Sequence, residues 1–142
     1  PLPQVGRVVM ADFKWLRHEF VLAAHRAQIA QHGGTDGTDG IRDHGLLESA
    51  LARPQNSAAY NPEHDVHDIA APYLFGIAKN HPFVDGNKRV AYAATETFLI
   101  INGHEATADQ LAKYEMVIRI ASGELDEPGA AEWLRANFRP AN

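Results

Sequence analysis

The sequence predicts a single all-α domain spanning residues 1–142. At least six segments repeat apolar residues at helical spacing, and candidate strands are few. Capping residues, glycines and prolines separate these segments, which is typical of short helices joined by loops. A chain of 142 residues is also long enough to bury a hydrophobic core of its own.

Composition excludes several classes of function. The formal net charge of −5 argues against direct binding to nucleic acid. The absence of cysteine excludes disulfides and thiol catalysis. No apolar run approaches the roughly 20 residues that a membrane helix requires. We therefore expect a cytoplasmic protein that binds neither nucleic acid nor membrane.

The first helix is predicted to begin at Asp12 or Lys14, after an extended lead-in over residues 1–11, and to continue to about Gln31. His25 is expected on a polar edge of this helix rather than as a ligand. The apolar face is predicted to comprise Leu16, Phe20, Ala23, Ala24, Ala27 and Ile29.

A glycine-rich loop over residues 33–40 ends the first helix. Asp43 is expected to cap a second, short helix, which ends near Leu51 because Arg53-Pro54 follows. Residues 54–64 contain two prolines and no helical period. They favour a plain loop, and a short exposed hairpin that could capture a peptide is the alternative.

The third helix is predicted to start within residues 66–69 and to end near Asn80. Either Asp65 or Asp68 could cap it. With Asp68 as the cap, Pro72 lies close to the first turn, where its missing N–H costs little; with Asp65 as the cap, Pro72 is interior.

Two histidines precede this helix or lie at its start. His64 and His67 are three residues apart, but no third metal ligand is evident nearby. We therefore expect both side chains to be solvated.

Three further helices are predicted. One follows residue 89 and ends at Gly103, one is capped by Thr107, and one begins at Asp126-Glu127-Pro128.

The segment densest in reactive groups is His81-Pro82-Phe83-Val84-Asp85-Gly86-Asn87-Lys88-Arg89. Pro82 should break any preceding helix, so the segment forms a loop that leads into a helix N-terminus. Unpaired backbone N–H groups and the helix dipole favour an anion there. Phe83 is expected to anchor the loop in the core.

Each polar side chain of this segment has a chemical interpretation. His81 can accept a proton from a hydroxyl nucleophile. Asp85 can cap the helix and can also ligate Mg²⁺. Gly86 lets the backbone approach phosphates, and Asn87 supplies a neutral donor. The cations that follow, Lys88 and Arg89, supply positive charge for phosphate.

This nine-residue motif resembles the signature of the Fic/Doc (Fido) superfamily, most of all its Doc, or "death on curing", branch of toxins from toxin–antitoxin pairs. The resemblance extends over about residues 16–138. It includes Gly33-Gly34, Gly40 to Asp43, Leu46 to Pro54, Phe98 to Gly103 and Trp133-Leu134. It implies a Fido-type bundle of six or seven helices, with His81 as the base and Asp85 as the Mg²⁺ ligand. It also implies that Gly86, Asn87, Lys88 and Arg89 bind the phosphates of ATP.

The resemblance also bears on the reaction. Most Fic enzymes carry glycine where this chain has Lys88 and arginine where it has Tyr92, and they transfer AMP. A lysine at that place is typical of Doc-type proteins, which transfer the γ-phosphoryl group to a threonine of elongation factor Tu and so halt translation. The resemblance therefore favours a protein kinase, with AMP transfer as the alternative.

Two further implications concern partners. The inhibitory Ser/Thr-x-x-x-Glu-Gly/Asn string of many Fic proteins is absent from this sequence. The resemblance thus implies a separate Phd-type antitoxin, and a catalytically inactive, antitoxin-binding corepressor is a second alternative. The superfamily's target-docking flap corresponds here to Arg53, Pro54, Gln55, Asn56, Ser57, Ala58, Ala59 and Tyr60.

Overall fold

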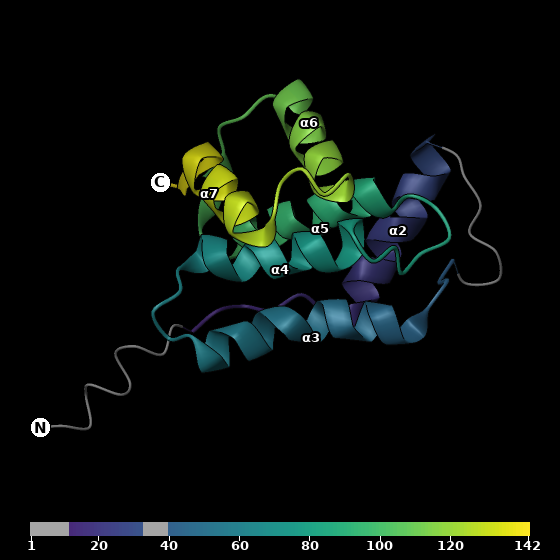
Figure 1. The fold of residues 1–142 in the computed structure, drawn as a ribbon, viewed down its shortest axis with the longest axis horizontal. Helices are drawn as coiled ribbons and strands as arrows, with labels where there is room; N and C mark the ends of the chain where they lie inside the picture. The colour runs from purple at the N-terminus through teal and green to yellow at the C-terminus, as the bar shows by residue number, and fades with distance from the viewer. Residues whose placement is uncertain (1–11, 33–39) are drawn as a thin grey trace, which may run out of the picture.

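The structure, a computed structural model, describes residues 12–32 and 40–142. Within these ranges it contains six helices and one two-stranded antiparallel sheet, which confirms the all-α prediction (Figure 1). The predicted lead-in and most of the glycine-rich loop lie outside the described residues. The helices are α2 (His18–His32), α3 (His44–Tyr60), α4 (Val66–Ala78), α5 (Asn87–Ile101), α6 (Gln110–Ala121) and α7 (Glu127–Asn137). The strands are β1 (His104–Ala106) and β2 (Phe138–Pro140).

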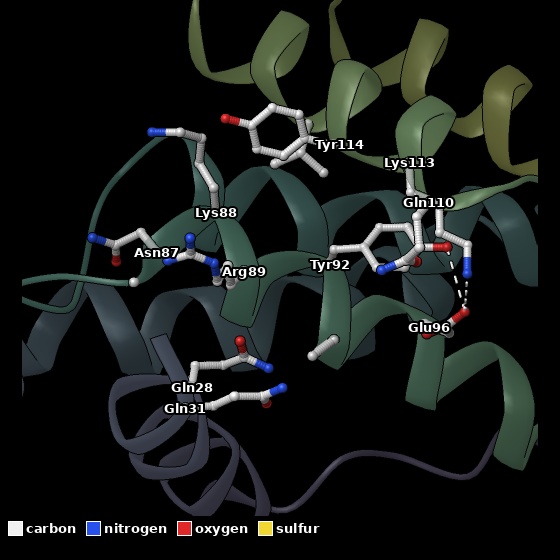
Figure 2. Close-up of a pocket in the computed structure, with 13 residues that line it drawn as sticks. Gln28, Gln31, Asn87, Lys88, Arg89, Tyr92, Glu96, Gln110, Lys113 and Tyr114 are labelled. Atoms are coloured by element: carbon white, nitrogen blue, oxygen red, sulfur yellow. Dashed lines mark hydrogen bonds and ion pairs between the residues drawn. The ribbon is translucent and has the colours of Figure 1, made fainter. Parts of the chain in front are cut away.

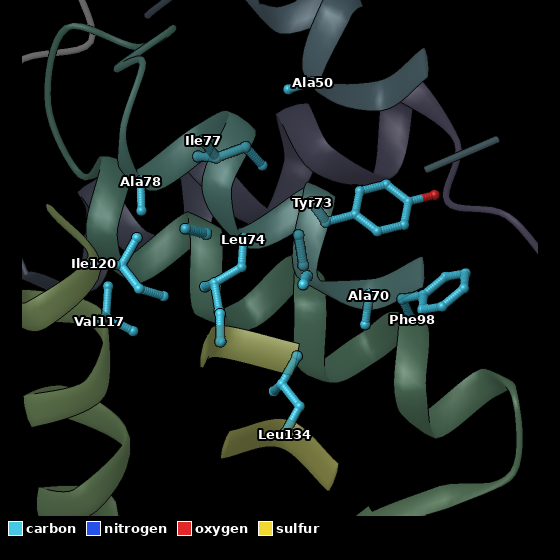
Figure 3. Close-up of a cluster of buried hydrophobic side chains, with 14 of the residues drawn as sticks. Ala50, Ala70, Tyr73, Leu74, Ile77, Ala78, Phe98, Val117, Ile120 and Leu134 are labelled. Atoms are coloured by element: carbon cyan, nitrogen blue, oxygen red, sulfur yellow. The ribbon is translucent and has the colours of Figure 1, made fainter. Parts of the chain in front are cut away.

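Helix α4 is the centre of the fold. It packs against α3 on one side and against α5 and α7 on the other (Figure 1). Ten of its thirteen residues are buried, which a helix can sustain only when neighbours cover it on nearly every side. Tyr73 and Leu74 of α4 meet Phe98 of α5 and Leu134 of α7 in one hydrophobic core (Figure 3).

The start of α4 resolves the choice between its two candidate caps. Asp65 is the N-cap and Asp68 completes a capping box, so Pro72 is interior. Arg135 of α7 binds both carboxylates, at 2.8 Å and 2.9 Å. Partial burial alone would raise the pKa of Asp65, but the Arg135 guanidinium and the cap amide hold it well below its usual range.

Helix α3 corrects the prediction for residues 54–64. It continues past Leu51 and through Pro54 to Tyr60, so residues 54–60 are helical and no hairpin forms. Only residues 61–64 form a turn, which leads to α4. Proline in a helix removes one hydrogen bond and crowds the preceding turn. Pro54 is buried in line with Leu47 and Ala50, and this packing compensates for the lost bond.

Helix α2 also differs from its prediction. It begins at His18, later than expected, and its buried residues are Val21 and His25. Of the predicted apolar face, Leu16 is buried, but Phe20 is 38% exposed and Ala23 and Ala27 are exposed. Within α2 the predicted face was therefore wrong in phase. The spacing of the alanines and Phe20 predicted one buried face, but the face that packs against the rest of the protein contains Val21 and His25.

The small sheet explains a second misplaced cap. Asp109, not Thr107, caps α6 by accepting a hydrogen bond from the Ala112 N–H. The Thr107 N–H instead donates to the Asn137 carbonyl at 2.8 Å, extending the pairing of β1 with β2. The predicted cap was wrong because a strand pair occupies that position.

The prediction of solvated histidines fails for His67. Its side chain is buried, with the ring edge-to-face against His104 at 5.1 Å. Neither ring nitrogen has a hydrogen-bond partner, although Nδ1 lies 3.5 Å from an oxygen of Asp65. Burial lowers the pKa of His67, which favours the neutral ring. His64 is half-buried.

Gly76 allows α4 to approach α3 closely at Ala50. A Cβ added there would lie 2.7 Å from the Ala50 Cβ and 2.9 Å from its Cα. We expect Gly76→Ala to lower the free energy of unfolding by about 1–3 kcal/mol, because the backbone of α3 must move. Urea unfolding measures this change. Gly45→Ala is the matched control on α3 and should stay within about 1 kcal/mol of the wild type. Equal stability of Gly76→Ala and the wild type would contradict the close packing.

Candidate functional site

The loop between α4 and α5 is anchored by a buried side chain and by hydrogen bonds within the loop. Phe83 is fully buried, which confirms its predicted role as an anchor. The Asn87 side chain accepts a hydrogen bond from the Phe83 N–H and donates one to the Phe83 carbonyl, both at 3.0 Å. The Asn87 amide therefore closes the loop onto the first residue of α5.

A second set of contacts comes from the segment before α3. The N–H groups of Arg42 and Asp43 donate to the Pro82 carbonyl, at 2.7 Å and 3.0 Å. The Arg42 guanidinium donates to the carbonyls of His81 and Asn80, at 2.7 Å and 2.8 Å. An antiparallel bridge between Ile41 and Phe83 adds to these contacts. We call this set of contacts, made by residues 41–43 with the loop, the clamp. The loop is thus fixed by segments that are distant in the sequence.

His81 adopts an unusual backbone conformation within this clamp. Its φ is +53°, and it is the one non-glycine residue with positive φ in the described ranges. This left-handed region costs most side chains about 1 kcal/mol or more, and such strain clusters at functional sites. The Arg42 contacts and the buried Pro82–Phe83 pair hold His81 there, with its side chain exposed.

Gly86, rather than Asp85, is the N-cap of α5. Its φ of +80° and ψ of 13° place it in the left-handed region, where glycine is favoured. The predicted capping role of Asp85 was wrong because the turn occurs one residue later. Gly86 offers no capping side chain, and the first turn of α5 contains no acidic residue. Both features leave the helix N-terminus suited to an anion.

A cavity of about 540 Å³ opens beside this helix N-terminus, between α2, α5 and α6 (Figure 2). Gly86, Asn87, Lys88 and Arg89 line one end of it. Gln28 and Gln31 of α2 and Tyr114 of α6 are among the residues that complete its wall. The exposed side chains of Lys88 and Arg89 bring two cations to the end formed by the uncapped amides.

The other end of the cavity contains a polar cluster. Lys113 of α6 binds the Glu96 carboxylate at 3.1 Å, and its ammonium lies 5.4 Å from the centre of the Tyr92 ring. The Tyr92 hydroxyl donates weakly to Glu96 at 3.5 Å. Burial, and then the neighbouring carboxylate, raise the pKa of Tyr92 far above its usual value. Tyr92 is therefore a neutral member of the cavity wall.

The predicted site residues occupy two adjoining regions. Gly86 to Arg89 line the cavity, whereas His81 and Asp85 lie outside it on the exposed loop. Sequence reasoning missed Arg42 and His25, which hold the loop through its carbonyls. Only the spacing of His25 from buried Val21, one helical turn earlier, could have indicated its inward position.

The sequence model of the Fic/DOC family matches residues 15–99. This segment contains the clamp, the loop and nearly all of α5.

The chain belongs to the Fic/DOC family.

Two relatives agree with this assignment. The chain is 33% identical over 130 residues to a protein named "Protein kinase doc" from Escherichia phage P1, covering 89% of this chain and 99% of that protein. It is 49% identical over 70 residues to "Toxin Doc" from Mycolicibacterium smegmatis, covering 49% of this chain. That second match spans about half of the relative's length, 54%.

The Fic/Doc resemblance also predicted a segment that docks the target protein, and the structure shows where this segment lies. The segment predicted to dock the target, Arg53 to Tyr60, forms the C-terminal half of α3. Arg53 binds Glu127 of α7 at 2.7 Å, and Tyr60 is 84% exposed.

Among the described residues, no helix has the length and apolar character needed to span a bilayer.

Proposed function

We propose that this Fic/DOC chain is a Doc-type protein kinase that acts as the toxin of a toxin–antitoxin pair. It transfers the γ-phosphoryl group of ATP to a threonine of a translation factor, elongation factor Tu, and so halts translation. The observation that carries the proposal is the strained His81 held beside an uncapped helix N-terminus that bears Lys88 and Arg89. The match to a protein named as a kinase over most of the chain supports it.

The proposed chemistry is an in-line phosphoryl transfer. His81 accepts the proton of the target hydroxyl, and the hydroxyl oxygen forms a bond to the γ-phosphorus. The bond from that phosphorus to the β–γ bridging oxygen breaks, and ADP leaves with the electron pair. Lys88, Arg89 and the amides that begin α5 bind the phosphate oxygens and stabilise the charge that develops on them.

Asp85 is the residue proposed to hold Mg²⁺. No group of three or more potential metal-ligating side chains occurs in residues 12–32 and 40–142. A single exposed carboxylate suits Mg²⁺, which usually binds proteins through one or two carboxylates and takes its other ligands from phosphates and water. Bound there, Mg²⁺ would neutralise phosphate charge during transfer.

The main alternative is AMP transfer. Most Fic enzymes, which transfer AMP, carry a second phosphate-binding arginine at the position of Tyr92. Here Tyr92 is neutral, and the nearby Lys113 is paired with Glu96. These contacts favour γ-phosphoryl transfer over AMP transfer.

Two protein partners follow from the proposal. A Phd-type antitoxin would neutralise the toxin, and the exposed apolar residues Leu111, Tyr114 and Ile118 on α6 offer a surface for an added helix beside the cavity. The exposed C-terminal half of α3, which ends at Tyr60, is the proposed docking site for the target.

Labelled ATP tests the reaction directly. The purified protein is incubated with Mg²⁺ and elongation factor Tu, using ATP labelled at either the γ- or the α-phosphate. We expect label in the factor only from the γ-position, and loss of that label when its acceptor threonine is replaced. Transfer of the α-label would overturn the kinase proposal in favour of AMP transfer.

A further inference from the structure

His25 of α2 contacts the functional loop although it lies sixty residues away in the sequence. Its side chain is only 1% exposed. The ring stacks on Phe83 with a centroid distance of 4.1 Å and an interplanar angle of 7°. Its Nε2 lies 3.0 Å from the carbonyl oxygen of Asp85. His25 therefore holds the loop both at its buried anchor and at the peptide that precedes α5.

The hydrogen bond defines which ring nitrogen carries a proton. A carbonyl oxygen only accepts, so Nε2 of His25 must be the donor. An apolar side chain of similar size could fill the same space beside Phe83 without any polar group to satisfy. What histidine adds at this position is a donor aimed at one particular backbone oxygen.

That oxygen belongs to the Asp85–Gly86 peptide, which sets the entry into α5. A trans peptide is planar, and its C=O and N–H point in opposite directions. Holding the Asp85 carbonyl toward α2 therefore directs the Gly86 N–H away from His25. Gly86 is the left-handed N-cap and forms part of the cavity wall. One hydrogen bond thus constrains both the turn that bears Asp85 and the N-terminus of α5, where we propose that the phosphates bind.

We propose that His25 is a positioning residue that orients the Asp85–Gly86 peptide and so shapes the binding site for MgATP. It acts only through the loop, because its buried ring cannot reach a bound substrate. This inference rests on the proposed kinase function for its consequence in catalysis. The orientation of the peptide itself does not depend on that function.

Two substitutions separate the hydrogen bond from the ring packing. His25→Phe keeps an aromatic ring against Phe83 but removes the donor. His25→Gln keeps an N–H donor at a comparable reach but removes the ring. His18→Phe is the matched control, because His18 is an exposed histidine at the start of the same helix.

Three measurements compare these proteins: the amide resonance of Gly86 by NMR, the affinity for a non-hydrolysable ATP analogue with Mg²⁺ by calorimetry, and kcat for phosphoryl transfer. For His25→Phe we expect a shifted Gly86 resonance and an affinity and kcat each reduced about 10- to 100-fold, with a melting temperature lowered by only a few degrees because one hydrogen bond is lost. His25→Gln should retain more affinity than His25→Phe at a lower melting temperature. His18→Phe should match the wild type.

A purely structural role predicts the opposite order, with His25→Phe as active as the wild type and His25→Gln the more impaired variant. That order, or an unchanged Gly86 resonance or nucleotide affinity in His25→Phe, would overturn the proposal. If His25→Gln does not fold, His25→Phe decides alone. A wild-type protein that transfers no phosphate would refute the kinase proposal, while the Gly86 resonance would still report the orientation of the peptide.

Discussion

Replacing His81 by alanine is expected to lower kcat for phosphoryl transfer by about 10²- to 10⁴-fold, the usual contribution of a general base. The melting temperature should change little because the side chain is exposed. The positive φ of His81 introduces a second variable, because alanine is strained in that region. His81→Asn addresses it, since asparagine tolerates left-handed backbone but is not a base at neutral pH.

Single-turnover kinetics with γ-labelled ATP and thermal unfolding measure the two effects, and His18→Ala serves as the control. Both His81 variants should lose activity to a similar extent. Expressed in cells without an antitoxin, neither variant should arrest growth. A His81→Ala protein as toxic as the wild type would show that catalysis is not the cause of toxicity. It would favour the binding-only alternative, a corepressor that acts through its antitoxin.

Lys88→Ala is the second substitution with a large expected effect. Lys88 is an exposed cation in the first turn of α5, where the helix dipole adds to its attraction for phosphate. Removing one preorganised donor to transition-state charge typically costs about 10²- to 10³-fold in kcat. We expect a loss of this size in kcat/KM for ATP.

Two further variants, Lys88→Arg and Lys14→Ala, show whether a loss of kcat/KM in Lys88→Ala is due to the charge at position 88. Arginine retains the positive charge, so Lys88→Arg should recover part of the activity. Lys14 is an exposed lysine on the segment before α2, and its replacement should leave kcat/KM unchanged. Wild-type activity in Lys88→Ala would mean that the phosphates bind away from the N-terminus of α5. Equal losses in Lys88→Ala and Lys14→Ala would indicate a general effect of charge.

The functional loop could be predicted from sequence because its reactive residues are contiguous. His81 to Arg89 carry the proposed base, the proposed Mg²⁺ ligand and the proposed phosphate-binding groups within nine positions, so no tertiary contact was needed to bring them together. The burial of Phe83 and a helix at the end of the motif were predicted for the same reason, although α5 begins at Asn87, three residues earlier than expected. The position of the N-cap was not predictable, because both Asp85 and Gly86 have good capping chemistry.

The errors have a common cause. Proline at position 54 suggested the end of a helix, but α3 continues because Pro54 packs beside Leu47 and Ala50. Thr107 looked like a cap, but its N–H donates to the carbonyl of Asn137, the last residue of α7. In each case a contact with a distant segment outweighed a local preference worth about 1–3 kcal/mol.

The sequence by itself determined the helical class of the protein, the order of its helices and the chemical content of the loop from His81 to Arg89. These depend on local periodicity and on groups that are neighbours along the chain. Only the tertiary structure decided how that loop is held. Arg42 and His25 reach it from distant segments and bind its carbonyl oxygens. A backbone carbonyl has no sequence signature, so the side chains that orient the loop become visible only once the helices are packed.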